Sequence, residues 1–391
     1  MEPKMNTNGN HSPLLQGDGA GVRLLGMTLP QLQALCAELG FPRFTAKQIC
    51  DWLYKKRVDS IDAMTNLSLA QRAKLNELAY VGRETPINCQ VSKDGTKKYL
   101  FPVRSSELGV QGYIEAVYIP ETNNSELRSP NSELSRATLC VSCQAGCKMG
   151  CRFCVTGSQG FHGNLSSGDI INQLFEVEKA ASCNSQFSIL NSQFSITNIV
   201  FMGMGEPMDN LDAVLDACAI LTSDWGLGWS PKRITVSTVG IIPGMKRFIE
   251  ECQCHLAVSL HNPFAAERQQ MMPVQKAYPL DDVLAMLRRY DWSGQRRLSF
   301  EYTMFGGIND DLAHARKLAE ALREIVCRVN LIRFHESPAA PSLKQSTPQA
   351  IKQFQDYLNA HGIICTLRAS RGQDIDAACG LLAAKPKQQQ S

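Results

Sequence analysis

Three closely spaced cysteines are the most chemically informative feature of the sequence. Cys147, Cys151 and Cys154 form a C-x3-C-x2-C pattern within the segment CQAGCKMGCRFC, residues 143–154. Three thiolates on one short loop can each bind a different iron of a 4Fe-4S cluster, which leaves the fourth iron open. The spacing therefore predicts an iron–sulfur cluster whose open iron can take a further ligand.

Zinc binding is the main alternative for this loop. A structural zinc ion normally has four protein ligands, and the C-x2-C pairs of zinc ribbons come in twos. The sequence has no second C-x2-C pair, and the CQC segment from Cys252 to Cys254 is too tightly spaced to act as one. We therefore favour the iron–sulfur cluster over zinc and over incidental clustering of thiols.

The composition is that of a globular protein of moderate charge. A chain of 391 residues exceeds the size at which one compact core usually stops growing, so a large catalytic domain with a smaller one is expected. The sequence shows no secretory signal and no stretch long enough to span a membrane, which predicts a cytoplasmic protein without a membrane partner. Its 15 cysteines indicate metal binding, catalysis or burial rather than structural disulfides in a reducing compartment. The net charge of +3 permits a nucleic-acid partner but does not establish one.

Apolar segments typical of strands alternate with helical segments over the second part of the chain. These strand segments are residues 137–142, 197–203, 233–240, 255–261, 298–305, 328–335 and 364–370. Such alternation predicts parallel β-α-β units and hence a barrel or a doubly wound sheet. Small or polar sequences such as GMGEP and SLHNP follow the strands. Because chemistry in parallel α/β folds lies at the carboxyl ends of the strands, we expect these loops and the cysteine loop to surround one site.

The remaining segments suggest further divisions of the chain. Residues 27–83 have apolar side chains at helical spacing, which predicts a small helical accessory domain, with Thr28 and Thr45 as helix N-caps. We expect this domain to bind RNA. Its basic run at 55–57 is interpreted first as a solvated helix end and second as an RNA-facing patch. Two polar segments that duplicate NSEL and NSQFSI are interpreted as surface insertions without chemistry. The full division is a disordered tail (1–26), the helical domain (27–83), a β-hairpin extension (84–136) with one insertion (122–135), a barrel (137–382) with the other (184–196), and a C-terminal tail (383–391).

Seven segments, taken in order, carry a resemblance to a known family. They are YIEAVYIPE, RATLCVS, QAGCKMGCRFCVTGSQGFHGNL, VFMGMGEPMDN, STVGI, AVSLHNP and RGQDIDAACG. The three-cysteine motif alone resembles the radical S-adenosylmethionine (SAM) enzymes, and the segments together resemble the RlmN-type adenine-C2 methyltransferases of ribosomal RNA. The resemblance extends from about Met27 to Leu382. It implies an α/β fold, a partial (β/α)6 TIM-like radical-SAM barrel with a small N-terminal helical domain.

The resemblance implies roles for individual residues in cofactor binding. Cys147, Cys151 and Cys154 would bind the 4Fe-4S cluster, whose open iron would take the amino and carboxylate groups of SAM. Glycine admits close backbone approach, while carboxylate and hydroxyl groups can hold the amino group, ribose and adenine of SAM. The positions that match SAM contacts are Gly205, Glu206, Ser237, Ser259, Leu260, His261 and His335, the last standing where many relatives have asparagine.

The resemblance also implies a reaction that needs two cysteines, because carbon 2 of adenine is electron-poor and polar methyl transfer from SAM cannot reach it. Cys379 would accept a methyl group from one SAM, and a radical generated from a second SAM would activate that methyl group for attack on the base. Glu115 would remove the proton from the substituted carbon, and Cys140 would release the RNA by forming a disulfide with Cys379. Cys143 stands where the family usually has serine and adds a spare thiol.

The partners that the resemblance implies are RNA and an electron donor. The expected targets are carbon 2 of adenosine 2503 in 23S rRNA and of adenosine 37 in tRNA. A flavodoxin or ferredoxin would supply electrons, and a monomer is expected. Two other functions stay open from the sequence alone. One is the related C8-adenine methyltransferase of the antibiotic-resistance type, which shares the cysteines, and the other is a zinc-containing RNA-binding module without catalysis.

Overall fold

A computed structural model describes residues 21–105, 110–120, 137–183, 196–294, 296–336 and 340–383 of the chain. The expected insertion at 122–135 lies outside these residues, as do nearly all of the insertion at 184–196 and most of both expected tails. The chain divides into two compact units, Met1–Arg83 with Ala219–Gly228, and Glu84–Cys218 with Trp229–Ser391. Each unit is described by itself below.

The smaller unit is a set of short helices around a leucine-rich core. It contains α1 (Leu29–Glu38), α2 (Thr45–Cys50) with a following π-helical turn (Asp51–Lys55), a short 3-10 turn (Ile61–Ala63), α3 (Leu69–Leu78), and the parallel strand pair β1 (Val22–Arg23) and β2 (Ala79–Tyr80). Its fully buried side chains include Leu32, Leu35, Ile49, Leu53 and Leu75. These are the apolar positions at helical spacing that predicted helices here.

One of the two predicted N-caps of this unit is wrong. Thr28 precedes α1, and its backbone N–H donates to the Gln31 side chain at 2.6 Å, as in a capping box. Thr45 is instead the first residue inside α2, whose N-cap is Phe44. The Thr45 side chain is buried and accepts a hydrogen bond from Gln71, so it serves packing between helices rather than capping.

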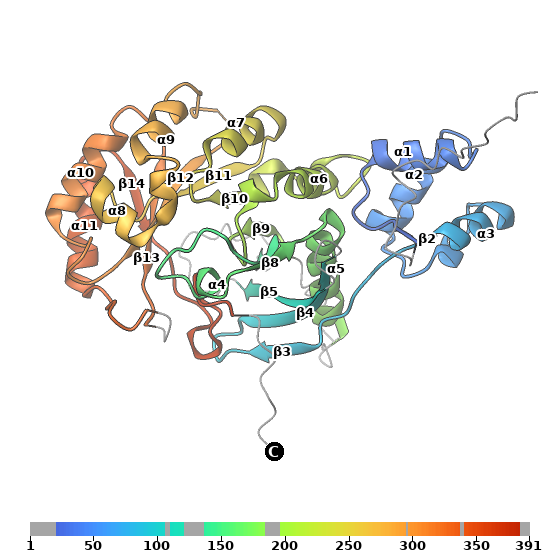
Figure 1. The fold of residues 1–391 in the computed structure, drawn as a ribbon, viewed down its shortest axis with the longest axis horizontal. Coiled ribbons are helices and arrows are strands. Elements are labelled where there is room, and N and C mark those ends of the chain that lie inside the picture. The colour runs from blue at the N-terminus through green and yellow to red at the C-terminus, as the bar shows by residue number, and fades with distance from the viewer. Residues whose placement is uncertain are drawn as a thin grey trace, which may run out of the picture. The chain divides into compact units, whose positions relative to one another are not determined.

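The larger unit is built on one extended sheet (Figure 1). Within the described residues this sheet has ten strands in the order β14-β13-β12-β11-β10-β9-β6-β5-β4-β3. Seven of these strands, β6 and β9 to β14, run parallel to one another, and each lies within one of the seven strand segments that the sequence predicted. They are β6 (Ala137–Cys140), β9 (Asn198–Phe201), β10 (Ile234–Thr238), β11 (His255–Ser259), β12 (Leu298–Met304), β13 (Arg328–Arg333) and β14 (Ile364–Leu367).

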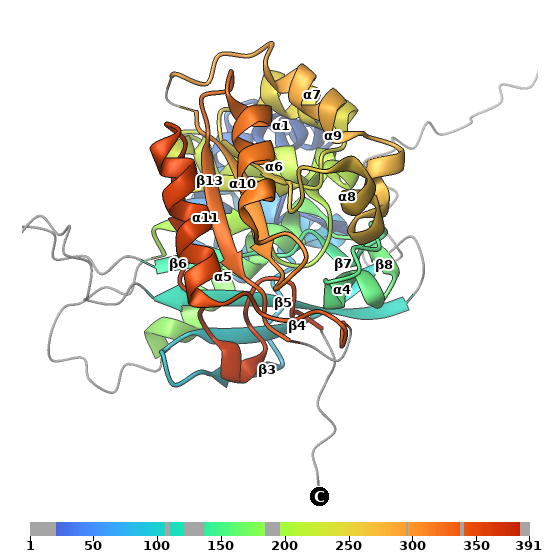
Figure 2. The same cartoon turned by 90° about the vertical axis from the view of Figure 1, so that its left-hand side faces the viewer.

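Helices follow the parallel strands and cover the outer face of the sheet. They are α5 (Ser167–Cys183), α6 (Leu211–Thr222), α7 (Ile242–Glu251), α8 (Ala265–Met271), α9 (Leu280–Leu287), α10 (Leu312–Leu322) and α11 (Pro348–Ala360). Figure 2 shows α10 and α11 side by side against the last strands. Because β14 and β3 are the two edges of the sheet in the described residues, the barrel is partial, and the fold expectation is confirmed. None of the helices in the described ranges combines the length and apolar character needed to cross a membrane.

Three antiparallel strands extend the sheet beyond β6. They are β3 (Asn88–Val91), β4 (Lys97–Ser105) and β5 (Val110–Pro120), and β5 pairs with β6. The sequence KDGT forms the turn between β3 and β4, where Gly95 has a positive φ of 82°. A two-stranded hairpin that the sequence analysis did not predict, β7 (Gln144–Gly146) with β8 (Phe161–Asn164), encloses the cysteine loop and the short helix α4 (Val155–Ser158).

Candidate active site

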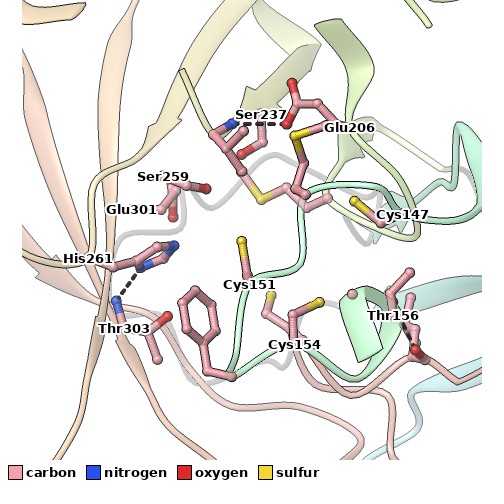
Figure 3. A pocket seen from close by; sticks show the side chains of 18 of the residues that line it. Cys147, Cys151, Cys154, Thr156, Glu206, Ser237, Ser259, His261, Glu301 and Thr303 are labelled. Carbon is pink, nitrogen blue, oxygen red and sulfur yellow. Dashed lines mark hydrogen bonds between the residues drawn. The ribbon is translucent and has the colours of Figure 1, made fainter. Parts of the chain in front are cut away.

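A cavity lies at the carboxyl ends of the parallel strands, where the sequence analysis placed the site (Figure 3). All but three of the candidate site residues line it. Those that do are Cys147, Cys151, Cys154, Gly205, Glu206, Ser237, Ser259, His261, His335 and Cys379. Leu260 does not line the cavity, because its side chain is fully buried and its backbone bonds to Glu301 and Arg268. The other two, Cys140 and Glu115, are described below.

The cysteine loop is held at its base by backbone contacts. The Cys147 N–H donates to the Gly160 carbonyl at 2.8 Å, and the Cys154 N–H donates to the Cys151 carbonyl at 3.1 Å. Gly146 has a φ of +75°, and a Cβ there would collide with the Gly160 carbonyl, so only glycine fits this position. The β7–β8 hairpin therefore fixes the base of the cysteine loop.

The three motif thiols fit a cluster better than a single metal ion. Burial raises the pKa of Cys147 to about 12 and raises the pKa values of Cys151 and Cys154, so each thiol must release a proton to become a ligand. These three sulfur atoms do not all lie within 4.8 Å of one another, although another cysteine trio in the described residues does. Three thiols that border one cavity at wider spacing suit different corners of a 4Fe-4S cube, and no fourth cysteine of this loop joins them there.

Glu206 connects two of the loops that surround the cavity. Its carboxylate accepts hydrogen bonds from the N–H groups of Met208 at 3.1 Å and Val239 at 2.9 Å. Burial raises the pKa of this carboxyl to about 7. The preceding Gly205 has a φ of +99°, and a Cβ there would lie 2.5 Å from a side-chain carbon of Gln144. The loop therefore requires glycine at 205 and presents an acidic acceptor at 206 to the cavity.

His261 presents a hydrogen-bond donor to the same cavity. Its Nδ1 accepts from the Thr303 N–H at 2.9 Å, and its ring packs edge-on against Phe153. Burial, with a smaller contribution from Arg268, lowers the pKa of His261 to about 3, so the ring is neutral. A neutral imidazole whose Nδ1 accepts must carry its proton on Nε2. The second histidine, His335, is half-buried, and its Nε2 contacts the Ser370 hydroxyl at 2.9 Å.

Arg268 is a fully buried cation that the sequence analysis missed. It lies in α8 and donates to the carbonyls of Val239 at 3.0 Å and Ser259 at 3.2 Å. It also donates to the Leu260 carbonyl at 3.1 Å and to the Gln275 side chain at 2.6 Å. The guanidinium thus joins the loops that follow β10 and β11. Its neighbours are distant in sequence, so no local pattern identifies it.

Cys379 lies on a C-terminal segment, residues 372–383, that is attached to the rest of the unit at both ends. Near its start, the Gly372 N–H donates to the Asp94 carboxylate at 2.9 Å, which attaches the segment to the KDGT turn. Near its end, the Val155 N–H donates to the Gly380 carbonyl and the Thr156 hydroxyl donates to the Leu382 carbonyl, both at 2.8 Å. The segment is thereby attached to the cysteine loop, and Cys379 is held, exposed, at the mouth of the cavity.

Cys140 is buried close to Cys379. Burial, with a smaller contribution from the neighbouring Cys379 thiol, raises the pKa of Cys140 to about 12, while the Arg368 guanidinium opposes the shift. Both cysteines are reduced thiols in the structure. Cys140 itself does not line the cavity, but Met202, which hydrogen-bonds to it through the backbone, does. The structure therefore places the two cysteines of the expected pair in one neighbourhood.

Glu115 does not line the cavity. It is buried, its Oε1 lies 3.2 Å from Lys98 Nζ, and its Oε2 accepts from the Ala383 N–H at 3.0 Å. The backbone of the C-terminal segment is thus hydrogen-bonded to the Glu115 carboxylate in this structure. Cys143 is also buried and absent from the cavity lining, and its carbonyl accepts from the Asn210 side chain at 2.8 Å.

The sequence analysis also missed an ion pair between a buried glutamate of the cavity wall and a partly exposed arginine. Glu301 of β12 lines the cavity, and its Oε2 lies 3.2 Å from Nε of Arg368. The same guanidinium contacts the Met202 sulfur at 3.3 Å. A glutamate in the otherwise apolar segment LSFEYTMF is a signal that could have identified Glu301.

Comparison with known proteins decides the family. The model of the ribosomal RNA large subunit methyltransferase N-terminal domain matches residues 22–81, and the radical SAM superfamily model matches residues 141–319. A Porphyromonas gingivalis protein described as a probable dual-specificity RNA methyltransferase RlmN is 50% identical over 360 residues, covering 92% of this chain and 96% of that protein. The chain belongs to the RlmN family of RNA methyltransferases. The expectation of a radical SAM methyltransferase is thereby confirmed.

Two further relatives agree with this assignment. A Syntrophotalea carbinolica protein described as a dual-specificity RNA methyltransferase RlmN is 40% identical over 364 residues, covering 93% of this chain and 90% of that protein. The crystal structure of a radical SAM methyltransferase from Sphaerobacter thermophilus superposes with a TM-score of 0.79 at 38% identity, covering 93% of this chain and 99% of that one. The partial barrel is therefore shared with an experimentally determined member of the superfamily.

Proposed function

We propose that this protein methylates carbon 2 of adenosine in 23S rRNA and in tRNA through a methyl group carried on Cys379. The observation that carries the proposal is the position of Cys379, which lines the same cavity as Cys147, Cys151 and Cys154 and lies close to Cys140. The names of the relatives, which describe dual-specificity RNA methyltransferases, support RNA as the substrate. Adenosine 2503 of 23S rRNA and adenosine 37 of tRNA are the proposed targets.

The cavity has the donor set for both cofactors. Cys147, Cys151 and Cys154 would hold the 4Fe-4S cluster, and bound SAM would supply a methyl group in one role and a radical that abstracts hydrogen in the other. A flavodoxin or ferredoxin would provide the electron, and the enzyme would act as a monomer. Two SAM molecules would be used per turnover.

The residues that surround the cavity would orient SAM. The Glu206 carboxylate would accept from its ammonium group, since it is a buried acceptor beside the cysteine loop. His261 would donate from Nε2, because Nδ1 is already engaged by the Thr303 N–H. Ser237 and Ser259, both partly buried at strand ends, would bond to the ribose or adenine, and Arg268 holds their loops in place.

Release of the methylated base would use the second cysteine. After the radical carbon carried on Cys379 has bonded to the base, Glu115 would take the proton from the substituted carbon, and the 4Fe-4S cluster would accept the unpaired electron that remains on the adduct. The Cys140 thiolate would then attack the Cys379 sulfur, forming an S–S bond and breaking the bond from sulfur to the new methyl carbon, which leaves with the electron pair and is protonated. The Arg368 guanidinium favours the Cys140 thiolate electrostatically, and an external thiol would reduce the disulfide before the next turnover. Glu115 must first exchange its contact with the Ala383 N–H for contact with the substrate.

Alanine variants of the two cysteines test this proposal because they must fail at different steps. Cys379→Ala cannot accept a methyl group and should form no adduct with RNA. Cys140→Ala should form the adduct but fail to resolve it, so a protein–RNA species that survives denaturing electrophoresis and disappears on nuclease treatment should accumulate. Cys365→Ala, a buried thiol of β14 that does not line the cavity, is the matched control and should behave like the unmodified enzyme. Release of methylated RNA by Cys140→Ala at the normal rate would contradict the role of Cys140.

The two other functions left open by the sequence are separated by different observations. Family membership favours the enzyme over a non-catalytic zinc-containing module. The C8-adenine methyltransferase differs from the proposed function in the position of the new methyl group. Analysis of the methylated nucleoside in the product RNA distinguishes these two positions.

A further inference from the structure

A second group of cysteines comes together far from the catalytic cavity. Cys218 lies in α6, Cys252 directly follows α7, and Cys254 directly precedes β11. Their sulfur atoms all lie within 4.8 Å of one another. Cys218 is separated from the other two by more than thirty residues of sequence, so only the fold brings the three together.

This trio is distinct from the site already described. Cys254 precedes the first residue of β11, whereas Ser259, the last residue of that strand, lines the catalytic cavity. A strand rises by about 3.3 Å per residue, so roughly 16 Å separates the two positions. None of the three cysteines lines the catalytic cavity. They are 2%, 8% and 0% exposed, in sequence order, so they form a buried cluster at the opposite end of the strands.

The spacing of the three sulfur atoms suits one metal ion. Zinc binds thiolates at about 2.3 Å, which places the sulfur atoms of a tetrahedral site roughly 3.8 Å apart. Three sulfur atoms already within 4.8 Å of one another reach that arrangement with small movements of the side chains. Soft thiolate ligands select ions such as zinc, and buried thiolates need such a partner because an isolated buried charge is strongly unfavourable.

A nearby cation supplies a second observation. Arg296 donates to the Ile249 carbonyl at 2.8 Å and to the Cys252 carbonyl, and its charge interacts with Cys252 and Cys254. Its Nε is buried and has no hydrogen-bond partner among the described residues. Three thiolates with one Zn²⁺ carry a net charge of about −1, which one guanidinium neutralises. The buried Nε–H of Arg296 is therefore a donor that could hydrogen-bond to the thiolates of a metal site.

We propose that Cys218, Cys252 and Cys254 bind a single zinc ion, with a water molecule in the fourth position. The ion would connect the carboxyl-terminal part of α6, the end of α7 and the start of β11. The ion would be independent of the iron–sulfur cluster and of the methyl transfer. Ligand binding to the native state alone would raise the stability of the fold.

Metal binding is tested in a full-length variant that lacks the cluster ligands. Cys147, Cys151 and Cys154 are all changed to alanine, so that zinc cannot occupy the cluster motif, and the protein is titrated with Co²⁺ as a spectroscopic substitute for zinc. One equivalent should bind with thiolate-to-cobalt charge-transfer absorption, and Zn²⁺ should displace it. Zinc should also raise the thermal unfolding midpoint of this variant.

Changing one proposed ligand gives the decisive comparison. Adding Cys252→Ser, or separately Cys218→Ser, should weaken cobalt binding by more than the roughly 10- to 100-fold that loss of an outer-shell contact causes. Adding Cys365→Ser, a buried thiol outside the trio, should change neither the stoichiometry nor the affinity. Circular dichroism confirms that each variant is folded. The proposal is overturned if the parent variant binds no cobalt or zinc, if binding persists unchanged in Cys252→Ser, or if thiol titration shows the trio oxidised to a disulfide that excludes metal.

Discussion

The Glu115 carboxylate lies 3.2 Å from the Lys98 ammonium, and both side chains are less than one tenth exposed. The two residues belong to neighbouring antiparallel strands, β5 and β4. Each also bonds to the segment that carries Cys379, Lys98 through the Asp376 carbonyl at 3.3 Å and Glu115 through the Ala383 N–H. The ion pair therefore connects the β-strand extension to the segment on both sides of Cys379.

Removing the cation of this pair should destabilise the protein. Lys98→Met leaves the Glu115 carboxylate buried without its partner, and breaking a buried ion pair from one side costs roughly 3 to 5 kcal/mol. Chemical denaturation measures the loss, and limited proteolysis should detect release of the C-terminal segment. Lys97→Met, on the same strand but with no ion pair to Glu115, is the control and should lose much less. Equal losses of unfolding free energy in the two variants would show that the ion pair between Lys98 and Glu115 does not stabilise the attachment of the C-terminal segment.

Arg268 gives a second prediction about the architecture of the cavity. Arg268→Met removes the donors to the carbonyls of Val239, Ser259 and Leu260, and each unsatisfied buried acceptor costs roughly 1 to 3 kcal/mol. We expect a loss of at least about 3 kcal/mol in unfolding free energy. Affinity for SAM, measured by calorimetry on the folded variant, should also fall. Arg289 is exposed, so Arg289→Met should change neither the unfolding free energy nor the SAM affinity. Normal SAM affinity in Arg268→Met would contradict the role given to Arg268 in positioning the loops of the cavity.

Glu206 predicts a specific pH dependence of stability. Its pKa is about 7 in the folded protein against an ordinary value of 4.5, because burial disfavours the carboxylate. The folded state therefore holds this proton more tightly. The resulting stabilisation is fully present below pH 4.5 and is lost as the pH rises through about 7. A shift of this size corresponds to roughly 3 kcal/mol.

The comparison with Glu206→Gln isolates this contribution. Without bound SAM, the unmodified protein should lose stability between pH 5 and 8 relative to Glu206→Gln, by on the order of 3 kcal/mol in denaturant titrations. Glu251→Gln, which changes a half-exposed carboxylate, should keep the pH profile of the unmodified protein. Parallel profiles for the unmodified protein and Glu206→Gln would mean that Glu206 is ionised throughout this range.

The cluster ligands can be separated from the spare thiol of the same loop. Changing Cys147, Cys151 or Cys154 to alanine should remove most of the iron from anaerobically reconstituted protein, because each lines the cavity. Cys143→Ala should retain iron, because its thiol is buried outside that lining. Iron and sulfide analysis with the visible absorption spectrum measures the difference. Loss of iron from Cys143→Ala would show that the ligand set is assigned wrongly.

The parallel strands and most of the cavity could be predicted because their signals are local. Strands of a parallel sheet are buried on both faces and appear as continuous apolar runs, as in residues 298–305. The loops that follow them must meet at one edge of the sheet. From that rule the sequence predicts that GMGEP and SLHNP lie beside the cysteine loop. The individual roles of the matched residues came only from the family resemblance.

The features that the sequence did not reveal depend on contacts between distant segments. Arg268 is one residue in a short helix, and its importance arises from carbonyls that other loops direct at it. The tight spacing of the CQC pair excludes it as a second C-x2-C pair, and Cys218, which completes the trio in the structure, lies far away in sequence. The attachment of the Cys379 segment to Asp94 and Glu115 likewise joins parts of the chain more than 250 residues apart.

The position of the new methyl group tests the central claim most directly. Cluster-reconstituted enzyme is incubated with a reductant, SAM that carries a deuterated methyl group, a 23S rRNA fragment and tRNA, and the RNA is digested to nucleosides for liquid chromatography and mass spectrometry. We predict labelled 2-methyladenosine from both RNAs with the unmodified enzyme and none with Cys379→Ala. Labelled 8-methyladenosine, or no methylated adenosine from enzyme that contains its full complement of iron, would contradict the proposed function.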